Sequence, residues 1–211
     1  MRDILYNAAI NYNKMKDIAY EIKLGRKGKM YDLILHFPAE SFYHLVGLQH
    51  LNDLTFPSTN KERIYKEILR GNINTEYLKK SQFYEKWHIE ERISNLYLLE
   101  TMIENNKILY KINLHEYRKY TSIIADYLLE YTMENIFYLF LVEERINPRF
   151  KGEHKGCSFF MKHGTDYTRG TAKATLLLLN KINDFSKETQ YIESVYLNPA
   201  YKKTHEKYMN A

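Results

Sequence analysis

The chain has 211 residues, a net charge of +5 and one cysteine. This length suits a single domain that buries a substantial core without staples, and a lone cysteine excludes both an internal disulfide and a cysteine-based zinc cluster within one chain. No apolar run approaches the ~20 residues that span a bilayer, and the amino terminus lacks the apolar core of a secretion signal. We therefore predict a cytoplasmic protein with no cofactor and no metal site.

The first half of the chain predicts helices and one strand. Apolar residues at helical spacing indicate an amphipathic helix over 2–24, which the two glycines of GRKGK at 25–29 would end. MYDLILHF at 30–37 has the composition of a strand, and Pro38 closes it. Further helices are expected over 40–51, from Ser58 or Thr59 to Gly71, from Thr75 to Lys86 and from His88 to Asn105.

The second half predicts strands. KILYKIN at 107–113 is extended, and the two apolar runs within 125–145 indicate a hairpin with Glu134 and Asn135 at its turn. CSFFMKH at 157–163 and KATLLLLNKI at 173–182 predict a second hairpin around the GTDYTRGT connection.

These elements predict an α+β fold in which an amino-terminal helical layer packs on a largely antiparallel, twisted sheet. We expect one domain over 1–211. It divides into an amino-terminal helix at 1–27, a core at 28–185 and a carboxy-terminal arm at 186–211.

Charge and aromatic content both favour an anionic partner. Residues 148–175 hold six Lys or Arg side chains against two acidic ones, a local charge of +4, and such a concentration attracts a phosphate backbone. The chain also has 20 Tyr and 10 Phe, and a tyrosine ring suits both a packed core and stacking on bases. We expect most of these rings to pack in the core.

The segment FPAESFYHLVGLQHL at 37–51 carries a resemblance to a known family. A short strand followed by SFYHLVGL resembles the FxHLxG segment of the PBECR4 family, which is grouped with barnase, EndoU, colicin E5/D and RelE-like nucleases. The resemblance continues through ADYLLEY at 125–131, CSFFMKH and ATLLLLNKI, and so covers about residues 28–185. It implies a compact nuclease-like fold and an RNA-cleaving activity.

Two histidines are candidates for the catalytic acid or base, because imidazole exchanges protons near neutral pH. His44 leads, since the resemblance places the HLVG sequence on it. The alternative for His44 is a capping or buried, hydrogen-bonded histidine. His163 is the second candidate, because it ends CSFFMKH beside Gly164, which permits close backbone approach.

The substrate-binding candidates lie in the basic segment. They are Lys155, Lys162 and Arg169 for phosphates, Ser158, Thr168 and Thr171 as donors to phosphate oxygens, and Tyr167 as a platform for a base. The alternative for each loop hydroxyl is ordinary turn hydrogen bonding. Glu90 and Glu91 are typical of a solvated helix surface.

We predict a metal-independent endoribonuclease of toxin or mobile-element type, which cleaves RNA by acid/base catalysis. Its partners would be RNA and a cognate inhibitor or host protein. The alternative is a non-catalytic phage or mobile-element protein that binds a host protein or nucleic acid. The sequence leaves the oligomeric state open.

Overall fold

The computed structural model describes residues 3–119, 121–145 and 152–203. Arg149 and Lys151 of the basic segment lie outside these described residues. The α-helices are α1 (Ile4–Met15), α2 (Ala39–Leu45), α3 (Lys61–Leu69), α4 (Thr75–Leu78), α5 (Ile89–Asn95), α6 (Leu99–Asn105) and α7 (Leu114–Tyr117), with short 3-10 turns at Leu48–His50 and Leu96–Leu98. Among the described residues, no helix has the length and apolar character needed to span a membrane.

The strands form one sheet that closes on itself. They are β1 (Ile18–Arg26), β2 (Lys29–His36), β3 (Ile108–Ile112), β4 (Tyr127–Thr132), β5 (Ile136–Glu143), β6 (Glu153–Met161), β7 (Thr171–Asn183) and β8 (Tyr191–Leu197). Their order is β1-β2-β6-β5-β4-β3-β7-β8, and β1 also pairs with β7, so that seven strands close into a barrel. Within the described residues β2 and β6 run parallel, and the other pairs are antiparallel.

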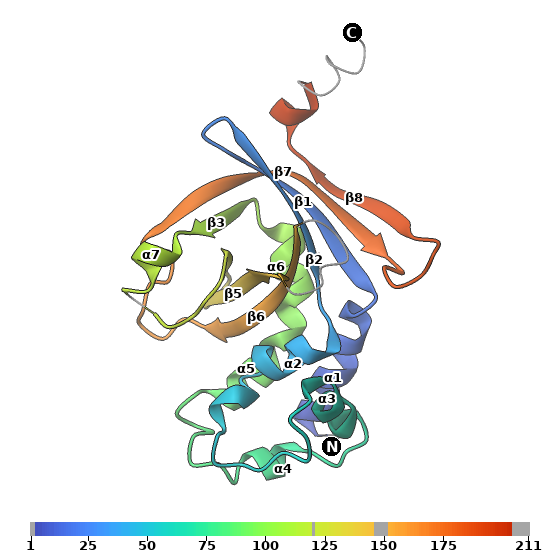
Figure 1. Ribbon diagram of the computed structural model, residues 1–211, viewed down its shortest axis with the longest axis vertical. Coiled ribbons are helices and arrows are strands. Elements are labelled where there is room, and N and C mark those ends of the chain that lie inside the picture. The colour runs from blue at the N-terminus through green and yellow to red at the C-terminus, as the bar shows by residue number, and fades with distance from the viewer. Residues whose placement is uncertain (1–2, 120, 146–151, 204–211) are drawn as a thin grey trace.

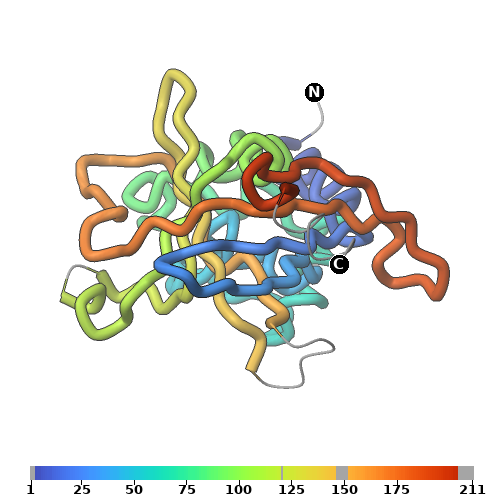
Figure 2. Tube along the Cα trace, turned by 90° about the horizontal axis from the view of Figure 1, so that it is seen from above, coloured from blue at the N-terminus to red at the C-terminus, as the bar shows by residue number. Residues whose placement is uncertain are grey.

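The predicted α+β class, with helices packed on a largely antiparallel sheet, is confirmed. Helices α1 to α5 gather at one end of the barrel (Figure 1), and β8 pairs with the later part of β7. Figure 2 shows the β1–β2 hairpin lying beside β7, with the turn between β7 and β8 projecting at one end.

The helix predicted over 2–24 is wrong beyond Met15. From Ile18 the chain is strand β1, in which Tyr20, Ile22 and Leu24 alternate into the core. No glycine or proline separates α1 from β1, so the sequence carries no stop signal there. Within GRKGK, Lys27 and Gly28 form the two-residue turn of a hairpin between β1 and β2, and both have positive φ.

The predicted pairing of CSFFMKH with KATLLLLNKI is also wrong. Both segments are strands, but β6 pairs with β2 and β5, whereas β7 pairs with β1, β3 and β8. Alternation along a strand sets which face is buried and does not choose its partner. Strand β8 in the carboxy-terminal arm was not predicted, and most of its side chains are exposed. Of the helix expected from Thr75 to Lys86, the first turn forms as α4.

Strand β5 is buried on both faces. Phe137, Leu139 and Leu141 join the main core, which the barrel shares with the helices. Tyr138 and Phe140 point the other way, into a smaller cluster of apolar side chains. That cluster contains Tyr117, Ala125, Leu128 and Phe160, with Tyr167 packed against it. The expected aromatic core is present, and the smaller cluster supplies one wall of the site described below.

Candidate active site

The larger of two neighbouring pockets has a volume of about 580 Å³. It lies between the start of α5, the end of β6 and the segment 121–124. Apolar walls come from Trp87, Ile123 and Phe160. The polar groups that reach it include His50, Lys86, His88, Arg92, Ser122, Ser158 and His163.

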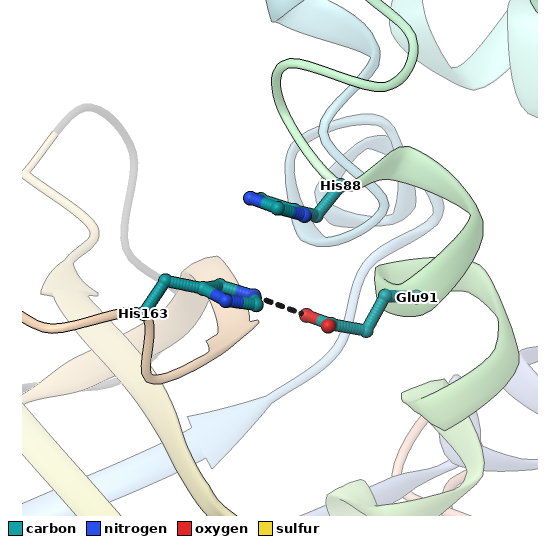
Figure 3. Close-up of side chains that lie close together, drawn as sticks. All are labelled: His88, Glu91 and His163. Atoms are coloured by element: carbon teal, nitrogen blue, oxygen red, sulfur yellow. Dashed lines mark hydrogen bonds and ion pairs between the residues drawn. The ribbon is translucent and has the colours of Figure 1, made fainter.

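Two histidines and a carboxylate meet at the rim of this larger pocket (Figure 3). His163 Nε2 lies 3.0 Å from Glu91 Oε1, so the carboxylate orients the imidazole. The His88 ring stacks on the His163 ring with 3.9 Å between centroids and 11° between planes. His88 also has a φ of 50°, in the left-handed region that non-glycine residues seldom adopt, and such strain concentrates at functional sites.

Arg92 places a buried, fixed cation against the same pocket. Its Nε donates to the carbonyl of Trp87 at 3.1 Å, and its Nη1 donates to the carbonyl of Phe159 at 3.2 Å. The guanidinium carbon lies 4.9 Å from the centre of the Phe160 ring. Burial lowers the pKa of Arg92 to about 10, so the group stays charged at neutral pH. A guanidinium has five N–H donors, which leaves donors to spare for an anion in the pocket.

The HLVG sequence packs directly on the helix that carries Arg92. Gly47 follows the end of α2 with a φ of 81°, and a Cβ there would lie 2.9 Å from Ile89 Cδ1 and 3.0 Å from Arg92 Cδ. Glycine therefore allows both the turn and the close approach to α5. The residues that follow reach the larger pocket, where the His50 ring stacks on Trp87 with 4.0 Å between centroids.

His44 faces a second, smaller pocket of about 420 Å³. Cys157 lines both pockets. Burial, together with Lys61 and Lys155, lowers the pKa of His44 to about 4. At neutral pH the imidazole is thus uncharged, and it can accept a proton but has none to spare as an acid. Burial raises the pKa of Cys157 to about 12, so its thiol is not a ready nucleophile.

The two pockets differ in charge. In the smaller pocket, Lys155 Nζ lies 2.7 Å from Glu40 and 2.5 Å from Glu144, so carboxylates already compensate this cation. The larger pocket has Lys86 and Arg92 on its wall, and the carboxylate at its rim, Glu91, contacts His163 rather than these cations. The larger pocket is therefore the better match to a phosphate.

The structure divides the predicted site residues among three places. His163, Ser158 and Tyr167 line the larger pocket. His44 and Lys155 line the smaller one. Four predicted substrate-binding residues line neither pocket: Lys162, Thr168, Arg169 and Thr171.

The hydroxyls of Thr168, in the loop before β7, and of Thr171, the first residue of β7, make local contacts. Thr168 Oγ1 donates to Asp166 at 2.7 Å, and Thr171 Oγ1 donates to the carbonyl of Thr168 at 2.5 Å. These are the ordinary turn hydrogen bonds considered as the alternative for them. The Tyr167 ring packs edge-on against Tyr138 and Phe160.

The predicted site residues did not include Trp87, His88, Glu91 or Arg92. Glu91 was expected on a solvated helix surface, yet it pairs with His163 across 72 residues of sequence. The one available signal was the spacing of His88 and Glu91, three residues apart on a predicted helix and hence on one face.

A family model described as phage-Barnase-EndoU-ColicinE5/D-RelE like nuclease4, PBECR4, matches residues 4–195. The chain belongs to this family. The match runs from α1 into β8 and so extends beyond the 28–185 over which the resemblance was expected. No curated protein and no solved structure matches the chain. Membership in PBECR4 makes a nucleic acid the expected class of substrate. The matched region contains the residues that line both pockets.

Proposed function

We propose that this PBECR4 chain is a metal-independent endoribonuclease of toxin or mobile-element type, with the larger pocket as its active site. The observation that carries the proposal is the His163–Glu91 pair beside the buried cation of Arg92. Proton transfer and stabilisation of developing negative charge are the two requirements of RNA cleavage, and these groups meet both.

The chemistry assigns a role to each group. The imidazole of His163, oriented by Glu91, takes the proton from a ribose 2′-hydroxyl. The 2′-oxygen then attacks the adjacent phosphorus, and the bond to the 5′-oxygen breaks to leave a 2′,3′-cyclic phosphate. His88 supplies the proton that the departing 5′-oxygen takes up. Arg92 stabilises the negative charge on the phosphorane, because its guanidinium is fixed by two backbone carbonyls before the reaction begins.

The smaller pocket extends the site along β6. Residues Lys155 to Ser158 pass from one pocket to the other, a distance of about 10 Å for an extended strand. One or two nucleotides cover that length, so we assign His44 and Lys155 to a nucleotide beside the cleaved one. Lys162 and Arg169 are assigned to phosphates farther along the RNA, whereas the hydroxyls of Thr168 and Thr171 donate within their own turn.

The test is cleavage of a labelled, random-sequence RNA pool in EDTA by purified protein and four single variants. His163→Asn and His88→Asn should each lose about 10²–10⁴-fold in rate, the usual contribution of a general acid or base. His115→Asn is the matched control, because His115 also contacts a glutamate, Glu116, but lies on α7 outside both pockets.

The fourth variant, His44→Asn, separates the two pockets. A loss smaller than that of His163→Asn supports the assignment above. A larger loss would transfer the catalytic role to His44 and the smaller pocket. If the wild-type protein binds RNA and cleaves none of the pool, the endoribonuclease proposal is wrong and the non-catalytic binding protein replaces it.

A further inference from the structure

Three ligand-type side chains converge at the rim of the larger pocket. One donor atom from each of His88, Glu91 and His163 lies within 4.8 Å of the other two. The closest pair, His163 Nε2 and Glu91 Oε1, is 3.0 Å apart. Two ligands of a tetrahedral Zn²⁺ site with bonds of about 2.0–2.2 Å are separated by about 3.3–3.6 Å, so this pair needs to open by only a few tenths of an ångström to hold an ion.

The backbone fixes where these side chains start. His88 is the residue just before α5, with a left-handed φ of 50°, and Glu91 lies in the first turn of that helix. His163 lies two residues beyond the end of β6 and approaches Glu91 from the side opposite α5 (Figure 3). Gly164 follows it with a φ of 88° and open space where a Cβ would be, so the chain turns away directly after the imidazole. Two independent elements thus bring the three donors together.

We propose that His88, Glu91 and His163 form a binding site for a divalent transition metal of the Zn²⁺ class, whose ion is not needed for RNA cleavage. Two imidazoles and one carboxylate suit Zn²⁺, whereas Mg²⁺ and Ca²⁺ prefer oxygen ligands alone. Three protein ligands leave a fourth position for water or a phosphate oxygen.

Binding requires one side chain to move. The two imidazole rings are parallel and stacked, and one ion cannot lie in both ring planes. The exposed His88 ring therefore swings off the His163 ring to bring a nitrogen to the ion. Lys86 and Arg92 are cations at the same pocket and oppose the ion, so the site is reversible rather than a structural centre that the fold needs.

Zinc binding and RNA cleavage then compete for one imidazole. His163 Nε2 donates to Glu91, so the lone pair that takes the ribose proton is on Nδ1. A zinc ion on Nε2 breaks this hydrogen bond and lowers the basicity of the ring, so added zinc inhibits cleavage and EDTA restores it. This consequence rests on the proposed function, whereas the metal site itself does not.

Isothermal titration of the tag-free full chain with zinc chloride tests the site without RNA. We expect one Zn²⁺ per chain, with affinity reduced at least about tenfold by Glu91→Gln and by His163→Asn and unchanged by His115→Asn. Co²⁺ in place of zinc should give the absorption bands of a tetrahedral site, and these should disappear in Glu91→Gln. Glu91→Gln keeps the size of the side chain, so it removes the charge without disturbing the helix.

The outcomes separate the two proposals. Zinc binding that persists in both Glu91→Gln and His163→Asn, or no binding by the wild-type chain, overturns the metal site. Zinc binding that follows the expected pattern in a chain that cleaves no RNA supports the metal site and overturns the endoribonuclease.

Discussion

Replacing Gly47 with alanine should destabilise the protein and displace the cation of the larger pocket. The φ of 81° at Gly47 costs an alanine about 1–2 kcal/mol. The added Cβ would lie 2.9 Å from Ile89 Cδ1 and 3.0 Å from Arg92 Cδ, both buried side chains, and such crowding costs about 1–3 kcal/mol. The free energy of unfolding should therefore fall by about 2–5 kcal/mol.

Gly71→Ala is the matched control for this experiment. Gly71 follows the end of α3 with a φ of 79°, and nothing lies within 4 Å of where its Cβ would be, so the loss should be about 1–2 kcal/mol. Urea unfolding followed by the fluorescence of Trp87, the single tryptophan, measures both variants. Equal losses in the two variants would refute the contact with α5. Unchanged RNA cleavage by folded Gly47→Ala would refute the displacement of Arg92.

Three further predictions concern single groups. Arg92→Lys should lose a hydrogen bond to the carbonyl of Trp87 or Phe159, so the free energy of unfolding in urea should fall by about 1–3 kcal/mol. RNA cleavage should be at least about tenfold slower. An unchanged rate would remove Arg92 from the site. Burial and the positive charges of Lys61 and Lys155 lower the pKa of His44 from 6.5 to about 4. Burial and the positive charge of Arg92 lower the pKa of His50 to about 4 as well. As pH falls, the unfolded chain takes up protons before the folded one, so the contribution of these histidines to the free energy of unfolding is complete above pH 6.5 and is lost as pH falls toward about 4. Urea unfolding across this range should show a smaller loss of free energy for the double variant His44→Gln, His50→Gln than for the wild type. An equal loss would contradict both pKa shifts. Glu153→Gln should lower the free energy of unfolding in urea by about 1.5–3 kcal/mol, because Glu153 is buried and contacts His36 at 3.1 Å. The control Glu62→Gln, in an exposed pair with Lys66, should lower it by less than about 1 kcal/mol. The reverse order would show that the buried pair does not stabilise the barrel.

The sequence predicted the elements of the fold better than their partners. Hydrophobic alternation identified β2, β3, β4 and β5 and the turn at Glu134–Asn135, because each depends on neighbouring residues. Closure of the barrel depends on the pairing of β1 with β7, in which Ile18 lies opposite Asn183 and Gly25 opposite Thr175. No local pattern specifies such a contact. The change from α1 to β1 was invisible for a related reason, since nothing between Met15 and Ile18 breaks a helix.

The candidate site was predictable in part. The position of His163 beside Gly164 drew attention to one imidazole of the larger pocket, and the HLVG resemblance drew attention to the segment that packs on α5. The roles proposed for Glu91 and Arg92 arise from contacts with residues far along the chain. Glu91 contacts His163, and Arg92 donates to the carbonyl of Phe159 in β6. In sequence both are ordinary charged residues of an amphipathic helix, so only the fold distinguishes them from solvated ones.

The most direct test of the central claim uses two substrates in EDTA. A labelled random-sequence RNA pool and its 2′-deoxy counterpart are incubated with the protein, and the ends of the products are analysed. Acid/base cleavage through the ribose hydroxyl predicts that RNA is cut to fragments ending in 2′,3′-cyclic phosphate while the 2′-deoxy pool stays intact. Cleavage of both pools, or cleavage of RNA that occurs only when a divalent metal replaces the EDTA, would contradict the account.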